Sequence, residues 1–202
     1  MAELNMFGLF EQENTASDEI LSQIEKEEEY KKYIDTHVAN VMRAYEELKH
    51  NNWLNTVYNS DILEAFDQLD RDKKILNHDA SKYSDAEFLA YRVRWYPATE
   101  EEKTNAALDE DWEPYAQAWK RHYTYNDHHP EHWIEEDGTI KDMPLPCIIE
   151  MICDWMSFDY IGKGSAVEYW DSTKERKMKK MSPYTIKQVD RIIDILRKDE
   201  KV

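Results

Sequence analysis

The chain has 202 residues, of which 43 are acidic and 26 basic, giving a formal net charge of −17. This charge opposes general binding to the polyanionic backbone of DNA or RNA. With four glycines, six prolines and no Ser/Gly-rich or Pro-rich linker in its middle, a chain of this length favours one domain with a sizeable core. We expect a flexible N-terminal arm at residues 1–16 and a single domain at 17–202.

The charge is unevenly placed along the chain. Residues 1–29 hold nine acids and one base, whereas residues 163–201 hold eleven bases and seven acids. An acidic head and a mildly basic tail could pair with each other or with a partner. The oligomeric state stays open, with a homo-oligomer among the alternatives.

The two cysteines and the apolar runs bear on the compartment. Cys147 and Cys153 lie six apart, which does not match the CxxC spacing of metal or redox sites, and we expect reduced, buried thiols. No apolar run approaches the ~20 residues that span a bilayer. The N-terminus also lacks the basic and then apolar pattern of a signal peptide. We therefore expect no membrane partner and a cytoplasmic protein, in the host cytoplasm if phage-encoded.

Helical periodicity dominates the sequence. Apolar residues recur at three- and four-residue steps over 17–50, which predicts one long amphipathic helix or two in series. Ser84 with Glu87 predicts a capping box, and Ser182 before Pro183 predicts a helix start. No segment alternates as a strand does. The predicted fold class is an all-α, single-domain bundle of six to seven helices, the further ones at about 60–76, 84–96, 111–125, 144–160, 165–180 and 183–198.

The histidines form the one unusual pattern in the chain. Four of the seven fall in the stretch RHYTYNDHHPEHW, at positions 122, 128, 129 and 132. Upstream, His37 lies on the first long helix and His78 directly precedes Asp79. Mixed histidine and carboxylate ligands suit divalent ions such as Mn, Fe, Co, Ni or Zn. Each piece alone also has an ordinary explanation: a hydrogen-bonded helical histidine, a chance dipeptide, or a polar turn anchored by Trp133.

The order of these pieces resembles the H…HD…D signature of the HD-domain metal-dependent phosphohydrolases. The matching residues are His37, His78, Asp79 and Asp154, within residues 30–160. The resemblance implies an HD-like helical fold with one or two divalent ions, Mg included. It also implies that Asp79 could bridge two ions, with His122 and His128 as ligands of the second.

Two groups of proteins show more detailed similarities to this chain. HDASK at 78–82 is similar to the HDxGK of the HD-GYP branch, where the lysine lies near the substrate phosphate, although serine replaces glycine and the GYP element is absent. The chain is also similar to uncharacterised small phage and bacterial proteins with HDxSK and HHxxxW motifs. It matches them at HDASKYS (78–84), AWKRHYTYNDHHPEHW (118–133) and EMICDWM (150–156).

The resemblance assigns candidate catalytic roles to Asp79, Lys82 and His129. Lys82 would stabilise charge on the phosphoryl group, and His129 would act as a general acid or as a structural neighbour of His128. Glu150 lies four residues before Asp154, hence on the same helical face, and could orient a water or a ligand histidine, or form a salt bridge.

A second group of residues could bind substrate. Positive side chains would hold a phosphate and aromatic rings would stack on a base; the simpler alternatives are surface ion pairs and core packing. The substrate-binding candidates are Lys82, Tyr83, Arg92, Arg121 and Trp133.

Three functions are consistent with these residues. The first is a metal-dependent phosphohydrolase, a phosphomonoesterase or phosphodiesterase, in which metal-activated water attacks a nucleotide or a small nucleotide-derived signal. The second is a phage-type binding protein that sequesters a nucleotide ligand or a host protein without turnover. The third is a structural protein whose histidines cap and cross-link helices.

Overall fold

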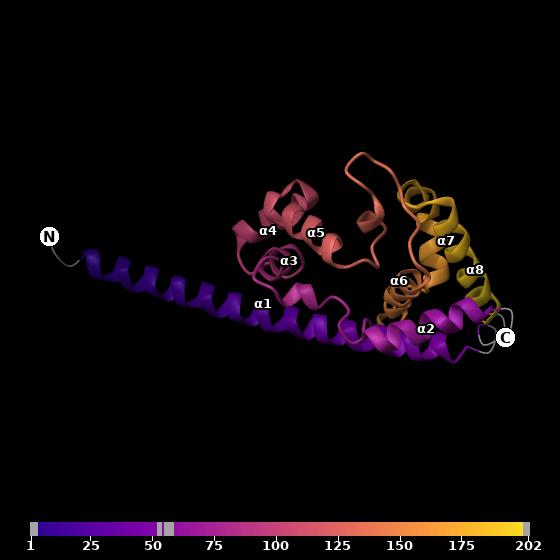
Figure 1. Ribbon diagram of the computed structural model, residues 1–202. Helices are drawn as coiled ribbons and strands as arrows, with labels where there is room; N and C mark the ends of the chain where they lie inside the picture. The colour runs from indigo at the N-terminus through magenta and orange to yellow at the C-terminus, as the bar shows by residue number, and fades with distance from the viewer. Residues whose placement is uncertain (1–3, 52–53, 55–58, 200–202) are drawn as a thin grey trace. The chain divides into compact units, whose positions relative to one another are not determined.

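The computed structural model describes residues 4–51, 54 and 59–199, and most of this part of the chain is helical (Figure 1). The described residues form no strand, apart from one isolated bridge between Ile134 and Ile140. The predicted all-α class is confirmed. The α-helices are α1 (Leu4–Lys49), α2 (Ser60–Asp72), α3 (Phe88–Trp95), α4 (Glu100–Ala107), α5 (Glu113–Tyr125), α6 (Leu145–Ser157), α7 (Ala166–Lys177) and α8 (Pro183–Asp199).

Most helices lie where the apolar period places them, and the differences concern boundaries. α1 begins at Leu4, before the expected start at residue 17. α3 begins at Phe88 with Glu87 at its N-cap position, so the start predicted at Ser84 is wrong. Residues 1–3 and 200–202, at the ends of the expected arm and domain, lie outside the described residues. The flexible arm at 1–16 and the single domain at 17–202 stay predictions.

Among the α-helices of the described residues, α4 is the one that the sequence pattern did not indicate. Its sequence, EEEKTNAA, is polar on nearly every side, so it lacks the apolar stripe on which the prediction depends. Its start has local chemistry instead, because Thr99 Oγ1 accepts a hydrogen bond from the backbone N–H of Glu102 at 3.2 Å.

The chain divides into two compact units, each built from two separate segments. The first unit comprises residues 1–34 and 82–121. In it α3 packs on α4, and the buried guanidinium of Arg92 pairs with the carboxylate of Glu102. The ring of Tyr30, on α1, lies 5.2 Å from the ring of Phe88.

The second unit, residues 35–81 and 122–202, is organised around α6. Helices α2, α7 and α8 all pack against α6 (Figure 1). The α6 sequence, LPCIIEMICDWMS, is apolar on all sides except at Glu150, Asp154 and the final Ser157, and a helix of this kind has to be buried. α6 therefore carries two carboxylates into the core of the unit.

Two further expectations can be compared with the structure. Cys147 and Cys153, both on α6, are free and buried as predicted, and burial raises the pKa of Cys147 to about 12. The predicted start of α8 is confirmed, because Ser182 Oγ accepts a hydrogen bond from the N–H of Thr185 at 3.1 Å. Among the described residues, no helix combines the length and the apolar character needed to cross a membrane.

The contrast between the buried and the exposed side of α2 predicts a large stability difference between two substitutions on this helix. Phe66 is 1% exposed and packs edge-on to Tyr45, so Phe66→Ala leaves a cavity and should lower the free energy of unfolding by about 3–5 kcal/mol. Leu63 on the same helix is 37% exposed, and Leu63→Ala should cost less than about 1 kcal/mol. Urea unfolding followed by circular dichroism measures both; equal losses would contradict the packing.

Candidate metal centre

The second unit brings all six predicted metal ligands together. His37 lies on α1, His78 and Asp79 follow α2, and Asp154 lies on α6. His122 comes from the last turns of α5, and His128 from the loop that follows. The residues His78, Asp79, His122 and His128 are each no more than 2% exposed. Five of the six ligands, His37 included, are therefore buried, and the side chain of Asp154 keeps 16% exposure.

One oxygen of Asp79 faces the histidines of the HD-like signature. Asp79 Oδ2 lies 3.5 Å from His37 Nε2 and 3.6 Å from His78 Nε2. Asp154 Oδ1 lies 3.2 Å and 3.9 Å from the same two nitrogens. We call these four residues the first half-site. Ligand atoms of His37, His78 and Asp79 lie within 4.8 Å of one another, close enough to hold one ion, and Asp154 adjoins them through its contacts with the two histidines.

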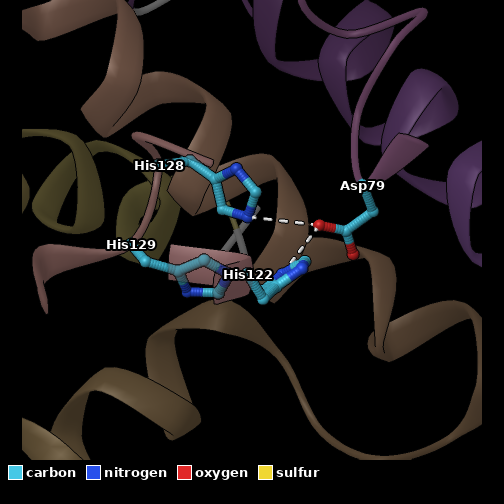
Figure 2. A group of neighbouring side chains, drawn as sticks. All are labelled: Asp79, His122, His128 and His129. Carbon is cyan, nitrogen blue, oxygen red and sulfur yellow. Dashed lines mark ion pairs between the residues drawn. The ribbon is translucent and has the colours of Figure 1, made fainter. Parts of the chain in front are cut away.

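The other oxygen of Asp79 faces the later histidines (Figure 2). Asp79 Oδ1 lies 3.2 Å from His122 Nε2 and 3.6 Å from His128 Nε2. His129 completes this group, since one ligand atom from each of the four residues lies within 4.8 Å of the others. We call Asp79, His122, His128 and His129 the second half-site. Asp79 thus belongs to both half-sites.

The backbone of Asp79 is held in the left-handed region, at φ +56°. This conformation favours glycine and costs a side-chain-bearing residue of order 1 kcal/mol or more, although aspartate tolerates it better than most. Glycine at this position would remove the strain and also the carboxylate. The strained backbone of Asp79 thus coincides with the position where a carboxylate lies between two sets of imidazoles.

Polar groups behind the histidines fix which nitrogen faces Asp79. Glu150 Oε1 accepts a hydrogen bond from His78 Nδ1 at 3.0 Å and lies 3.3 Å from His128 Nδ1. Because an ionised carboxylate only accepts hydrogen bonds, both Nδ1 atoms carry the proton. In the neutral form of each ring, Nε2 is then an acceptor, and it points to the carboxylate oxygens of the half-sites.

Imidazole nitrogens and carboxylate oxygens, both hydrogen-bond acceptors, therefore face each other inside a buried site. His78 Nε2 and His128 Nε2 are buried and have no hydrogen-bond partner among the described residues. Buried polar atoms without partners are costly, and a cation between imidazole nitrogen and carboxylate oxygen removes the cost. The donor set of imidazole nitrogens and carboxylate oxygens therefore fits a divalent transition ion.

Two further groups support individual ligands. Ser157 Oγ donates to the carbonyl of Asp154 at 2.7 Å, which leaves its lone pairs for His37 Nδ1 at 3.2 Å. Asn126 Nδ2 donates to Ser81 Oγ at 2.8 Å and lies 3.2 Å from His122 Nδ1. Such outer contacts orient metal-binding imidazoles.

Electrostatics keep the carboxylates ionised and one histidine neutral. Burial alone would raise the pKa of Glu150, but hydrogen bonds from His128 and His78 outweigh burial and lower it to about 2. Burial likewise opposes ionisation of Asp154, and the hydrogen bond from His37 nonetheless lowers its pKa below the ordinary range. Burial, with repulsion from the neighbouring imidazoles, lowers the pKa of His129 well below 6.5. A neutral His129 fits the role of ligand better than that of general acid.

Most of the substrate-binding candidates lie in the first unit. Lys82 Nζ lies 5.6 Å from the centre of the Tyr91 ring, and Tyr83 is 45% exposed. Arg121 Nε is 3.6 Å from Glu87 Oε1. The buried Arg92 already has its charge balanced by Glu102. The roles of these residues toward a substrate stay predictions.

Trp133 is the substrate-binding candidate that belongs to the second unit. Its Nε1 donates to the carbonyl of Asp127 at 2.8 Å, and its ring packs against the core of the unit. These contacts anchor the loop that carries His128 and His129. This is the anchoring role that the polar-turn explanation foresaw; a role in base stacking stays a prediction.

Sequence reasoning missed three supporting residues. Ser81 and Asn126 lie inside the quoted motifs but were given no role there, and Ser157 lies outside them; the roles of all three follow from contacts across the fold. A signal was available for two of them: Asn126 lies four residues after His122, and Ser157 three after Asp154, the spacings of side chains on one helical face.

Comparison with known proteins assigns the chain to a family on the basis of its sequence. A family model described as a family of unknown function (DUF5662) matches residues 26–195, which include every residue of both half-sites. No curated protein matches the chain, and no solved structure matches it.

The geometry predicts that divalent ions stabilise the folded protein. At a free Mn²⁺ concentration of 100 times the dissociation constant, the free energy of unfolding should rise by about 2.7 kcal/mol, because the ion binds the assembled site only. Asp79→Asn should abolish most of this gain, since Asp79 serves both half-sites. Thermal unfolding with and without a chelator measures the effect. His50→Gln is the matched control, because the His50 side chain is 73% exposed; a loss of the gain in that variant would contradict the assignment.

The hydrogen bonds of Glu150 predict a pH dependence for the ion-free protein. The folded-state pKa of about 2 lies below the ordinary 4.5. Ionised Glu150 therefore stabilises the fold fully above about pH 4.5, and this contribution shrinks as the pH falls toward 2. The stability difference between wild type and Glu150→Gln should shrink over that window. Urea unfolding in chelator from pH 6 to 3 tests this, and a constant difference would count against it.

Proposed function

The chain belongs to a family of unknown function, DUF5662, and because membership brings no activity with it, we propose a function from the site: a metal-dependent phosphohydrolase that acts on a nucleotide or a small nucleotide-derived signal. One observation carries the proposal. The carboxylate of Asp79 lies between two groups of buried imidazoles, with one oxygen toward each. A shared carboxylate of this kind is suited to hold two ions close together.

The residues of each half-site have defined tasks in this proposal. His37, His78, Asp79 and Asp154 would hold one ion, and His122 and His128, with Asp79, would hold the other. Bound ions would supply Lewis acidity, lowering the pKa of water and neutralising charge on phosphoryl oxygens. Glu150 and Ser157 hold the imidazoles in orientation from behind, so the site needs little rearrangement when it is filled.

His129 and Lys82 take the remaining roles. The lowered pKa of His129 keeps its imidazole neutral near pH 7, able to ligate an ion or to accept a proton. Lys82, three residues after Asp79, would contact phosphoryl oxygens, with Arg121 as a further candidate. The nucleotide part of the proposal rests on the resemblance to HD-domain enzymes and on the aromatic candidates Tyr83 and Trp133. We propose a cytoplasmic setting, in a host cell if the chain is phage-encoded.

Turnover of phosphate esters tests the proposal directly. With Mn²⁺ or Co²⁺ present, the wild-type protein should release phosphate or a nucleotide product from at least one member of a panel of nucleoside mono-, di- and triphosphates and cyclic nucleotides. Asp79→Asn should lower kcat at least 100-fold, because it weakens both half-sites at once. His50→Gln should retain the wild-type rate. Chromatography of the reaction products measures all three.

The same panel separates hydrolysis from sequestration. A binding protein would retain a nucleotide through long incubation with no product, and Asp79→Asn would leave the retained nucleotide chemically unchanged, as in wild type. That pattern would replace the hydrolase with the binding protein. Turnover that persists in Asp79→Asn would contradict the placement of the reaction at this site.

A further inference from the structure

One carboxylate contacts a ligand of each half-site. Glu150 Oε1 lies 3.0 Å from Nδ1 of His78, in the first half-site, and 3.3 Å from Nδ1 of His128, in the second. The two imidazole rings lie against each other, with centroids 4.4 Å apart. All three side chains are buried, at no more than 4% exposure. Rotation of either ring would break its contact with the same oxygen.

Burial of the Glu150 carboxylate costs free energy, and the packing of α6 does not need a carboxylate at this position. α6 is otherwise apolar apart from Asp154 and the final Ser157, and a carboxylate in such a core is unfavourable unless it is hydrogen-bonded. Replacement by an apolar residue would be the simpler solution for packing alone. The retained carboxylate satisfies two imidazole N–H groups at once, and these belong to ligands of different half-sites.

We propose that Glu150 is a positioning residue that couples the two half-sites, so that its loss weakens ion binding at both positions together. This inference rests on the metal centre of the proposed function and adds how its two halves are linked. Asp79 links them through direct ligation, and Glu150 links them from behind, through His78 and His128. The two halves then form one pre-organised unit.

Ser157 provides the matched comparison. Its hydroxyl contacts one ligand histidine, His37, and the carbonyl of Asp154. Removal of the hydroxyl should therefore affect the first half-site alone. Loss of such an outer contact typically weakens metal affinity about 10- to 100-fold.

The test is calorimetric titration of Co²⁺ into the metal-depleted full-length chain, with the visible absorption of bound Co²⁺ as a second readout. Wild type should bind two ions. Glu150→Ala should weaken both affinities by about 10- to 100-fold and change the absorption of both ions. Ser157→Ala should weaken one affinity only. Glu150→Gln, which keeps an acceptor oxygen and the side-chain shape, should retain more affinity at both positions than Glu150→Ala and also serves if the alanine variant does not fold.

Several results would overturn the coupling. Glu150→Ala with wild-type affinities, or with one affinity changed and the other intact, would show that Glu150 serves at most one half-site. Binding of a single ion by wild type would also overturn it while leaving a one-ion hydrolase intact. Two coupled ions without turnover of any phosphate ester would support the coupling and remove the proposed function instead. Uptake of no ion by wild type would overturn both.

Discussion

Buried negative charge is the constraint on which the second unit depends. Asp79 and Glu150 are almost fully buried and Asp154 is largely so, all within one helical unit. Carboxylates in a protein interior need hydrogen bonds, counter-charges or metal ions to be stable. Glu150 obtains hydrogen bonds from imidazole N–H groups. Asp79 faces imidazole nitrogens, of which those of His78 and His128 present lone pairs. A cation bound between these acceptors would complete the balance of charge.

Successive elements of the chain each place polar groups around the buried carboxylates. α6 is apolar enough to occupy the centre of the unit and carries Glu150 and Asp154 inside with it. The turn after α2 places Asp79 in a left-handed conformation that aims one oxygen at each half-site. The loop after α5 is anchored by Trp133 and delivers His128. Elements distant in sequence thus each contribute a few polar groups to one buried point.

Most of the helical fold follows from local sequence pattern, whereas the candidate metal ligands were predicted from residues spread along the chain. Their convergence in one unit is observed, and ion binding by them stays a prediction. The apolar period marks seven of the described helices, and the order of His37, the His78-Asp79 pair and Asp154 marks the first half-site. α4 escaped because it has no apolar stripe. Ser157, Asn126 and Ser81 escaped because a hydrogen bond to an imidazole depends on three-dimensional position rather than on residue type.

The division into two units also could not be predicted from local sequence pattern. The chain passes between the units after residues 34, 81 and 121. The first of these points lies within α1 and the last within α5, so neither coincides with a loop, a glycine or a shift in composition. Sequence reasoning locates linkers by such marks, and they are missing at residues 34 and 121; the crossing after residue 81 lies between α2 and α3.

The central claim is that Asp79 lies between two ion positions. Anomalous scattering from crystals grown with Mn²⁺ tests it most directly. The account predicts peaks on both sides of the Asp79 carboxylate, one within about 2.0–2.3 Å of Nε2 of His37 and His78 and one at that distance from Nε2 of His122 and His128. Anomalous peaks only at surface carboxylates, with none beside Asp79, would contradict it.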